Sequence, residues 1–381
     1  MPVDPIALVA NTVFRNYTAS VAKLTGGQVN YVWRLADSSG KSVIVKYADE
    51  QLASYPEMPF SVDRMKFETR GLALFHSVPG DSGLEALTKL SADLRKTEGV
   101  RVPKLLHVDL SVPFVVLEDI GDHKGYEDWC ATKPPLADIE YVCGKIGEWI
   151  AHLHGFGHKH LDKLEPLMTN TPAREMLQDV LYEDTSSRWI KYTEYADKSQ
   201  ISQLVKDFST TVNRRISGEV RPKDRVLLFG DMWSGSVMFD TQARLINIID
   251  FEFADIGLVY GDVAHFVAHL LPVYALGNAD YNPNSSPCPP PVAAFLISYG
   301  RVLKEQYPHI HKALIDETIE QCTRFLGIEI SRDVMMGNWC SCGSGQKPGT
   351  TPLTCKCLGV WLEFCRKYIL GTDDSVFNLL K

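Results

Sequence analysis

Two acidic motifs, each following an apolar run, place the strongest constraint on the fold of this chain. The first, LLFGDMWSGSVMFD, has Asp231 directly after Gly230, and the second, IDFEFADIG, has Asp250 and Glu252 after the apolar run LINII. Carboxylates that emerge together from strand ends repel one another unless a cation or a reacting hydroxyl lies between them. The two motifs therefore predict an acidic site; the alternative is a solvated hairpin with ordinary turn-forming acids.

Length and composition narrow the class of protein. The 381 residues are 45% hydrophobic and 23% charged, enough for two sub-domains with a substantial core. The formal net charge of -8, with dispersed Lys and Arg, argues against nucleic-acid binding but allows a small ligand. The segment MPVDPIALVANTVF does not resemble a secretory signal, and no apolar run is long enough to span a membrane. Because an odd count of nine cysteines suits a reducing compartment, we expect a cytoplasmic protein.

The residue pattern changes near residue 118. Before it, residues 21–49 alternate as two strands around the turn DSSGK, SVDRMKFETRGLALFHSV has a helical stripe, and RVPKLLHVDLSVPFVVLEDIG supplies two further strands. After it, amphipathic helical segments dominate, at 136–156, 200–216, 292–305 and 312–330. We expect an α+β protein with an N-terminal lobe, residues 1–118, on a small antiparallel sheet and a larger, mainly helical C-terminal lobe, residues 119–381, with a cleft between them.

A lysine interrupts the apolar strand VIVKYA at Lys46. Such a side chain either reaches water at a sheet edge or points into the cleft, where it would bind phosphate oxygens with Glu68 of the next helix as its partner. Gly26 and Gly27 could let backbone N–H groups approach a polyphosphate, although an ordinary hairpin turn is at least as compatible with two glycines.

The acids fit the same chemistry. Asp231 follows an apolar run and a glycine, so its carboxylate is expected to point into the cleft. A carboxylate in that position can orient a substrate hydroxyl and accept its proton. The carboxylate of Asp250 is expected in a similar position and can bind a Mg²⁺ ion that bridges phosphate oxygens. Glu252 would lie on the same side if the backbone stays extended.

Taken in order, these residues and the motifs LEDIG, IGEWIAHLHGFG and GDVAHFVAHL resemble the aminoglycoside phosphotransferase and choline kinase superfamily, whose fold is similar to that of protein kinases. Within it, GGQVNYVWRL, SVDRMKFE, GDMWSGSVMFD and IDFEFADIGLVYGDVAHFVAHLL are most similar to methylthioribose kinase. The resemblance extends, with gaps, from residue 20 to 335. It implies an ATP- and Mg²⁺-dependent kinase that acts on a small hydroxylated molecule.

The resemblance also implies roles for individual residues. Asp231 would be the catalytic acid/base, and Trp233 and Arg332 would contact the acceptor. The metal ligands would be Asp250, Glu252 and Ser236; methylthioribose kinases also have Ser where many superfamily members have Asn. The nucleotide would be held by Gly26, Gly27, Asn30, Lys46, Glu68, Leu117, Glu118 and Asp119, of which the last three form the hinge whose backbone meets adenine.

Three departures from the superfamily pattern bear on the rate of the reaction and on recognition of the acceptor. Phe229 replaces the usual His before Gly-Asp, Met232-Trp233 replaces Leu-His, and Asp333 follows Arg332 where methylthioribose kinases have two arginines. The acceptor is expected to be a methylthioribose-like sugar, another hydroxylated metabolite, or an aminoglycoside or choline-type compound. The alternative is a kinase-like nucleotide-binding protein with little or no turnover. A homodimer is compatible with the sequence.

Two further clusters suggest metal ligands. The four histidines of AHLHGFGHKH, His152, His154, His158 and His160, are expected to lie on a packing helix that Gly155 and Gly157 end. Four thiolates could bind zinc, although a single-residue spacer strains chelation and a loop with free thiols is favoured. These cysteines are Cys340, Cys342, Cys355 and Cys357.

Overall fold

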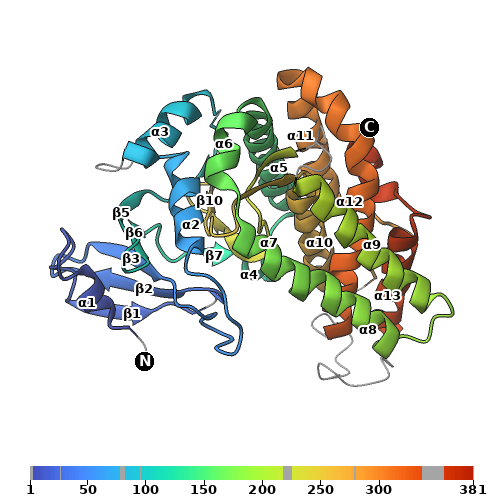
Figure 1. Cartoon of the computed structure of the whole chain (residues 1–381), viewed down its shortest axis with the longest axis horizontal. Helices are drawn as coiled ribbons and strands as arrows, with labels where there is room; N and C mark the ends of the chain where they lie inside the picture. The colour runs from blue at the N-terminus through green and yellow to red at the C-terminus, as the bar shows by residue number, and fades with distance from the viewer. Residues whose placement is uncertain are drawn as a thin grey trace.

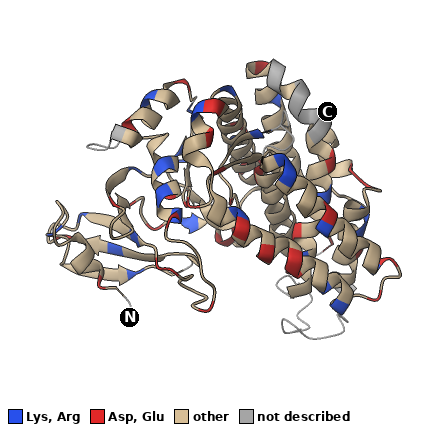
Figure 2. Ribbon diagram, viewed as in Figure 1, with Lys and Arg blue, Asp and Glu red and all other residues tan. Residues whose placement is uncertain are grey.

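The computed structural model describes residues 3–25, 27–77, 82–94, 96–217, 225–278, 280–336 and 356–380. A sheet-containing part lies at one end of the molecule and a mass of helices at the other (Figure 1), which confirms the α+β, kinase-like prediction. Charged residues of both signs are interspersed over both parts (Figure 2). None of the described helices is both long and apolar enough to span a bilayer. Gly26 and the cysteines Cys340, Cys342 and Cys355 lie outside the described residues, as does the side chain of Cys357.

An antiparallel sheet of order β1-β2-β3-β6-β5 forms the N-terminal part. Its strands are β1 (Ser20–Lys23), β2 (Tyr31–Ala36), β3 (Ser42–Tyr47), β5 (Leu105–Asp109) and β6 (Phe114–Glu118). The accompanying helical segments are α1 (Pro5–Val9), α2 (Arg64–Ala73), α3 (Ser82–Leu90) and the short η1 (Ser91–Asp93). Helix α2 contacts β5 and β6, so it packs on the side of the sheet that ends in β5.

The alternation of β3 explains its lysine. Val43 and Val45 point to the face that packs with Val9 of α1 and Trp33 of β2 in a small apolar cluster. Because successive side chains of a strand point to opposite faces, Lys46 points the other way, toward α2 and the rest of the molecule. It is buried there and does not reach water at a sheet edge.

The C-terminal part is mainly helical. Helix α5 (Leu136–Lys159) packs along α11 (Pro290–Gln306) and against strand β8 (Arg225–Leu228), while α12 (Pro308–Met336) packs on α10 (Tyr260–Gly277) and α13 (Lys356–Leu370). The other helical segments are α4 (Tyr126–Ala131), α6 (Leu161–Met168), α7 (Thr171–Leu177), the π-helical η2 (Gln178–Glu183), α8 (Asp184–Tyr192), α9 (Lys198–Ile216), η3 (Ser234–Ser236) and η4 (Ser375–Leu380).

Strand pairing brings the two acidic motifs together. Strands β9 (Val237–Asp240) and β10 (Leu245–Ile248) form a hairpin, in a sheet with β4 (Val100–Arg101) and β7 (Lys124–Gly125). Strand β8, however, lies outside the hairpin and pairs antiparallel with β11 (Asp255–Leu258). The chain that leaves β8 therefore lies beside the chain that enters β11, and these two segments carry the acids.

Helix α5 does not end at its glycines, which corrects the sequence-based expectation. It continues through Gly155 and Gly157 to Lys159. A Cβ atom at Gly157 would overlap the backbone nitrogen of Leu227 in β8. Gly157 therefore permits close contact between the helix and the strand. Local sequence rules instead interpret a glycine at this place as a helix end.

This contact predicts opposite effects for two helical glycines. Gly157→Ala should lower the free energy of unfolding by about 1–3 kcal/mol, because the added methyl group forces α5 and β8 apart. Gly359→Ala, in α13 with open space at the Cβ position, should raise it by about 0.5–1 kcal/mol through helix propensity. Urea unfolding of both variants checks this, and equal effects would contradict the packing argument.

Candidate active site

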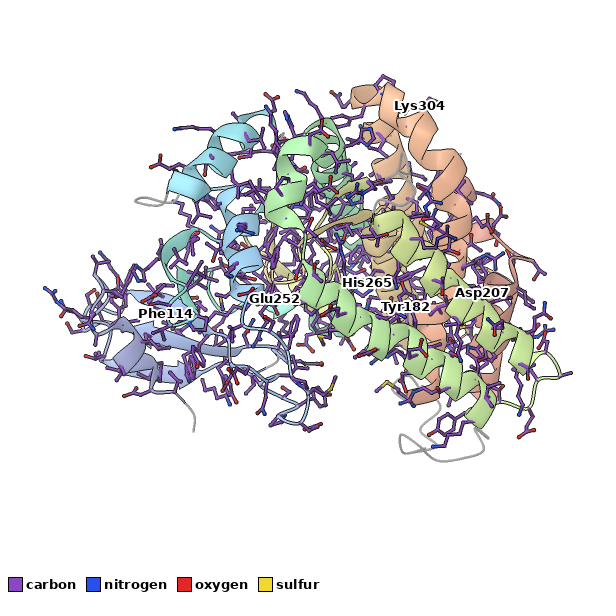
Figure 3. All side chains as sticks on the ribbon, viewed as in Figure 1. Phe114, Tyr182, Asp207, Glu252, His265 and Lys304 are labelled. Carbon is purple, nitrogen blue, oxygen red and sulfur yellow. The ribbon has the colours of Figure 1, made fainter. Side chains whose placement is uncertain are left out.

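A cavity of about 580 Å³ is lined by residues from both parts of the chain. The sheet side supplies Gly27, Asn30, Val32 and Lys46, and most of the remaining wall comes from the acidic motifs, α7, η2, α9, α10 and α12. Figure 3 shows Glu252 where the sheet meets the helical part, with His265 and Tyr182 deeper among the helices. The cavity thus joins the predicted nucleotide residues to the predicted catalytic acid.

Lys46 lies at the centre of a carboxylate cluster. Its Nζ donates to Glu68 Oε2 at 3.1 Å, to Asp250 Oδ1 at 2.8 Å and to Glu252 Oε2. The Lys46 side chain is 3% exposed, whereas that of Asp250 is 32% exposed and faces the cavity. The structure therefore brings together four residues that the sequence predicted to meet.

Burial and charge act in opposite directions on this cluster. Burial disfavours the Lys46 ammonium, but Asp250, Glu252 and Glu68 outweigh it and raise its pKa well above the ordinary value. Burial raises the pKa of Glu252 and of Glu68, and Lys46 opposes both shifts. Three carboxylates thus share one ammonium, and their oxygens lie within 4.8 Å of one another. Such a set of hard oxygen donors fits a divalent cation such as Mg²⁺.

The backbone at Asp250 is unusual. Its φ of 71° lies in the left-handed region, which a non-glycine residue rarely adopts. The condition of an extended backbone from Asp250 to Glu252 is therefore not met, although both side chains still contact Lys46. Strain of this kind is typical of functional sites, where the surroundings hold a side chain in one direction.

Asn30 supports the cluster from the sheet side. Its Nδ2 donates to Glu252 Oε2 at 3.0 Å, and its Oδ1 accepts from Nε of the buried Arg64 at 2.8 Å. In this arrangement Asn30 orients a carboxylate. Its predicted contact with nucleotide remains a prediction.

Asp231 faces the same cavity with its side chain 32% exposed. His265 Nε2 lies 3.1 Å from Asp231 Oδ1, and the Ser236 hydroxyl donates to the Asp231 carbonyl oxygen at 2.9 Å. Gly230, at φ 92°, lets this loop touch the second motif, since a Cβ there would overlap the Phe253 carbonyl. The tight turn before Asp231 therefore fixes one acidic motif against the other.

A buried aspartate, Asp262, supports the Asp231 loop from below. Its two oxygens accept from the Phe229 and Gly230 backbone N–H groups, each at 2.8 Å. His154 Nε2 lies 3.0 Å from the same carboxylate, and both side chains are fully buried. Phe229 itself packs edge-on against Phe251 at 4.8 Å between ring centroids. The loop is therefore held through its backbone, which accounts for an apolar Phe where the superfamily has His.

The four histidines of AHLHGFGHKH, three on α5 and His160 at its C-terminal cap, contact four separate partners. His154 contacts Asp262, His152 contacts the Tyr307 hydroxyl, and the two others reach partners on different elements. Their separate hydrogen bonds are consistent with the packing helix expected from the sequence.

Of the other residues that the sequence predicted for the site, some line the cavity and some do not. Leu117 and Glu118 end β6 and Asp119 follows it. None of the three is in the described cavity lining, and Asp119 pairs with Arg34 at 2.6 Å. Their adenine contact remains a prediction. Trp233 and Arg332 do line the cavity. The Arg332 Nε donates to the Val180 carbonyl of the π-helical segment at 3.0 Å.

Sequence reasoning gave no role to His265, His269, Glu329 and Asp333, which all line the cavity near Asp231. Burial, followed by the charge of His265, lowers the pKa of His269 to about 3. A ring nitrogen of His265, a ring nitrogen of His269 and a carboxylate oxygen of Glu329 also lie within 4.8 Å of one another. The spacing of the two histidines in GDVAHFVAHL places them on one helical face, whereas nothing local marks Glu329.

Comparisons with known proteins show which proteins this chain is similar to. Two fungal 4-hydroxytryptamine kinases are similar: that of Psilocybe cyanescens is 28% identical over 259 residues, and that of Psilocybe cubensis 26% over 266. The matches cover 65% and 66% of this chain and only 66% and 67% of the relatives, about two thirds of their length. Neither is a methylthioribose kinase, so the finer resemblance is not borne out by these comparisons.

Solved structures show the same fold. An amicoumacin kinase in complex with AMP-PNP, Ca²⁺ and amicoumacin has a TM-score of 0.51 at 13% identity, with 98% of this chain and 96% of that chain covered. The GDP complex of an aminoglycoside 2'-phosphotransferase also has a TM-score of 0.51, at 12% identity over 96% and 98%. The sequence pattern described as the phosphotransferase enzyme family matches residues 20–295. This chain therefore belongs to the phosphotransferase enzyme family.

Proposed function

We propose that this chain is an ATP- and Mg²⁺-dependent kinase that transfers the γ-phosphoryl group to a hydroxyl of a small molecule. The observation that carries the proposal is the convergence of Lys46, Asp250 and Glu252 on the cavity that Asp231 also faces. Family membership supports the reaction class. The buried Glu68 contact supports a fixed position for the Lys46 ammonium.

Each residue of the cluster has a role in this proposal. Lys46 binds phosphate oxygens, and Asp250 and Glu252 would hold Mg²⁺. The Ser236 hydroxyl, also predicted as a metal ligand, is buried outside the cavity lining and donates to the Asp231 carbonyl oxygen. Bound Mg²⁺ supplies charge neutralisation at the phosphates. Asp231 orients the acceptor hydroxyl and accepts its proton. Catalysis then depends mainly on positioning and electrostatics, without a covalent enzyme intermediate.

The acceptor that we propose is a hydroxylated aromatic amine. The aromatic residues Trp233, Tyr182, Tyr260 and Phe325 line the cavity, and aromatic side chains suit contact with a flat ring. The carboxylate of Asp333 lies in the same wall and suits an ammonium group. The names of the two fungal relatives point to the same class. A methylthioribose-like sugar and choline- or aminoglycoside-type acceptors are the competing candidates.

Mg²⁺-dependent ADP release over an acceptor panel tests the proposal. The panel contains a hydroxytryptamine, methylthioribose, choline, ethanolamine and an aminoglycoside, each with and without EDTA. We expect release that requires both Mg²⁺ and the hydroxytryptamine. Turnover with another acceptor alone would refute the acceptor class but not the kinase. Nucleotide binding without any ADP release would favour a kinase-like binding protein without turnover.

A further inference from the structure

His265 of α10 lies between carboxylates from two other elements. Its Nε2 is 3.1 Å from Asp231 Oδ1, in the loop after β8, and its Nδ1 is 3.1 Å from Glu329 Oε2 on α12. The His265 side chain is 12% exposed and that of Glu329 10%, so water screens these contacts weakly. An imidazole that faces a carboxylate at each nitrogen is stabilised as the imidazolium.

The other charged groups around His265 do not cancel this preference. His269, one turn along α10, has a pKa lowered to about 3 and is neutral near pH 7. On α12, Arg332 pairs with Asp333 at 3.3 Å, and the pKa of Asp333 is raised to about 6 by burial and by Glu329. Burial opposes the charge of His265, but Glu329 and Asp231 outweigh it and raise its pKa well above the usual value.

We infer that His265, backed by Glu329, is the positioning residue that holds the Asp231 carboxylate for proton transfer, an inference that rests on the proposed function. The His265 N–H occupies Asp231 Oδ1, which is the one side-chain hydrogen bond that this carboxylate makes within the described part of the chain. Oδ2 is thereby left for the acceptor hydroxyl. Glu329 in turn fixes the ring and its charge. His265 acts on the reaction only through Asp231.

The coupling can be measured without an acceptor. NMR titration of the histidine ring signals, in protein treated with EDTA, identifies His265 as the signal absent from His265→Gln. We expect it to titrate well above the ordinary histidine range and to move down by about 1–2 pH units in both Glu329→Gln and Asp231→Asn. A signal that does not move in Asp231→Asn would overturn the inference, because the ring would then not be coupled to that carboxylate.

The positioning role is measured by kinetics with the acceptor that the panel identifies. His265→Gln should lower kcat by about 10- to 100-fold, because a loosened carboxylate is poorly aligned, with the KM for ATP little changed. His265→Ala should be slower still, since Gln retains one N–H donor. The alkaline limb of the kcat profile should disappear in His265→Gln and move to lower pH in Glu329→Gln.

His158→Gln is the matched control, because His158 lies on α5 and contacts the Arg225 carbonyl outside the Asp231 cluster. It should keep the wild-type kcat and pH profile. A His265→Gln variant with the same kcat and alkaline limb as this control would overturn the inference. Wild-type protein that releases no ADP with any acceptor would refute the proposed function instead, and the NMR titration would still decide the coupling.

Discussion

Asp231→Asn is expected to reduce kcat by about 100- to 10,000-fold while leaving ATP binding and the fold intact. Asn has nearly the same shape and still offers Oδ1 to His265, so the contact at 3.1 Å can persist. It cannot accept the proton of the acceptor hydroxyl. Because Asp231 makes no contact with Lys46 among the hydrogen bonds of that cluster, the nucleotide site should be unaffected. ADP release and calorimetric ATP titration measure the two effects separately.

Asp207→Asn is the control for this substitution. Asp207 lies on α9, exposed and well away from Glu252 (Figure 3), and its hydrogen bond comes from Gln203 on the same helix. Its kcat should match that of the wild type. If Asp231→Asn also retained the wild-type kcat, proton transfer to Asp231 would be excluded.

Lys46→Met should abolish Mg²⁺-ATP binding and lower the free energy of unfolding by about 3–5 kcal/mol near pH 7. The substitution removes the ammonium from three carboxylates, two of which are buried with it. Lys46 has a folded-state pKa raised above its unfolded value, so its contribution is fully present at pH 7 and is lost only as the pH rises through the folded value.

The variant should also have a characteristic pH dependence. Burial raises the pKa of Glu252 from 4.5 to about 8 even though Lys46 opposes the shift. A carboxyl with a raised folded pKa stabilises the fold below its unfolded pKa, and that stability is lost as the pH rises toward the folded value. Without Lys46 the loss between these two pH values should be steeper than in the wild type. Added Mg²⁺ should restore part of the stability, since a cation replaces the ammonium.

Urea unfolding at pH 5 and pH 8, with and without Mg²⁺, checks these effects. Lys89→Met is the matched control, because Lys89 is 82% exposed on α3 and its substitution should change stability by less than about 0.5 kcal/mol. Equal stability of the two Met variants would contradict the account of the cluster.

The acidic motifs, Lys46 and Glu68 could be predicted because their signals are local. An acid directly after an apolar run, and a lysine inside a strand, are unusual enough to indicate a site in short stretches of sequence. Their meeting in space is a property of strand pairing: β8 pairs with β11 and β3 presents Lys46 toward α2. The resemblance to a known superfamily supplied the expectation that these residues meet, which periodicity alone does not.

The residues that sequence reasoning missed depend on tertiary contacts. Glu329 faces His265 only because α12 packs on α10, and nothing in the local pattern of α12 distinguishes this acid. Gly157 looks like a helix end because its partner, Leu227, is remote in sequence. Short helices such as α6, which contains Pro166, show too few periods to be predicted.

A structure with Mg²⁺ and a non-hydrolysable ATP analogue tests the central claim most directly. The account predicts phosphate oxygens at Lys46 Nζ, a Mg²⁺ ion that joins them to the Asp250 carboxylate, and Asp231 facing the γ-phosphate from the acceptor side. A nucleotide bound away from Lys46, or a metal ion with no contact to Asp250, would contradict it.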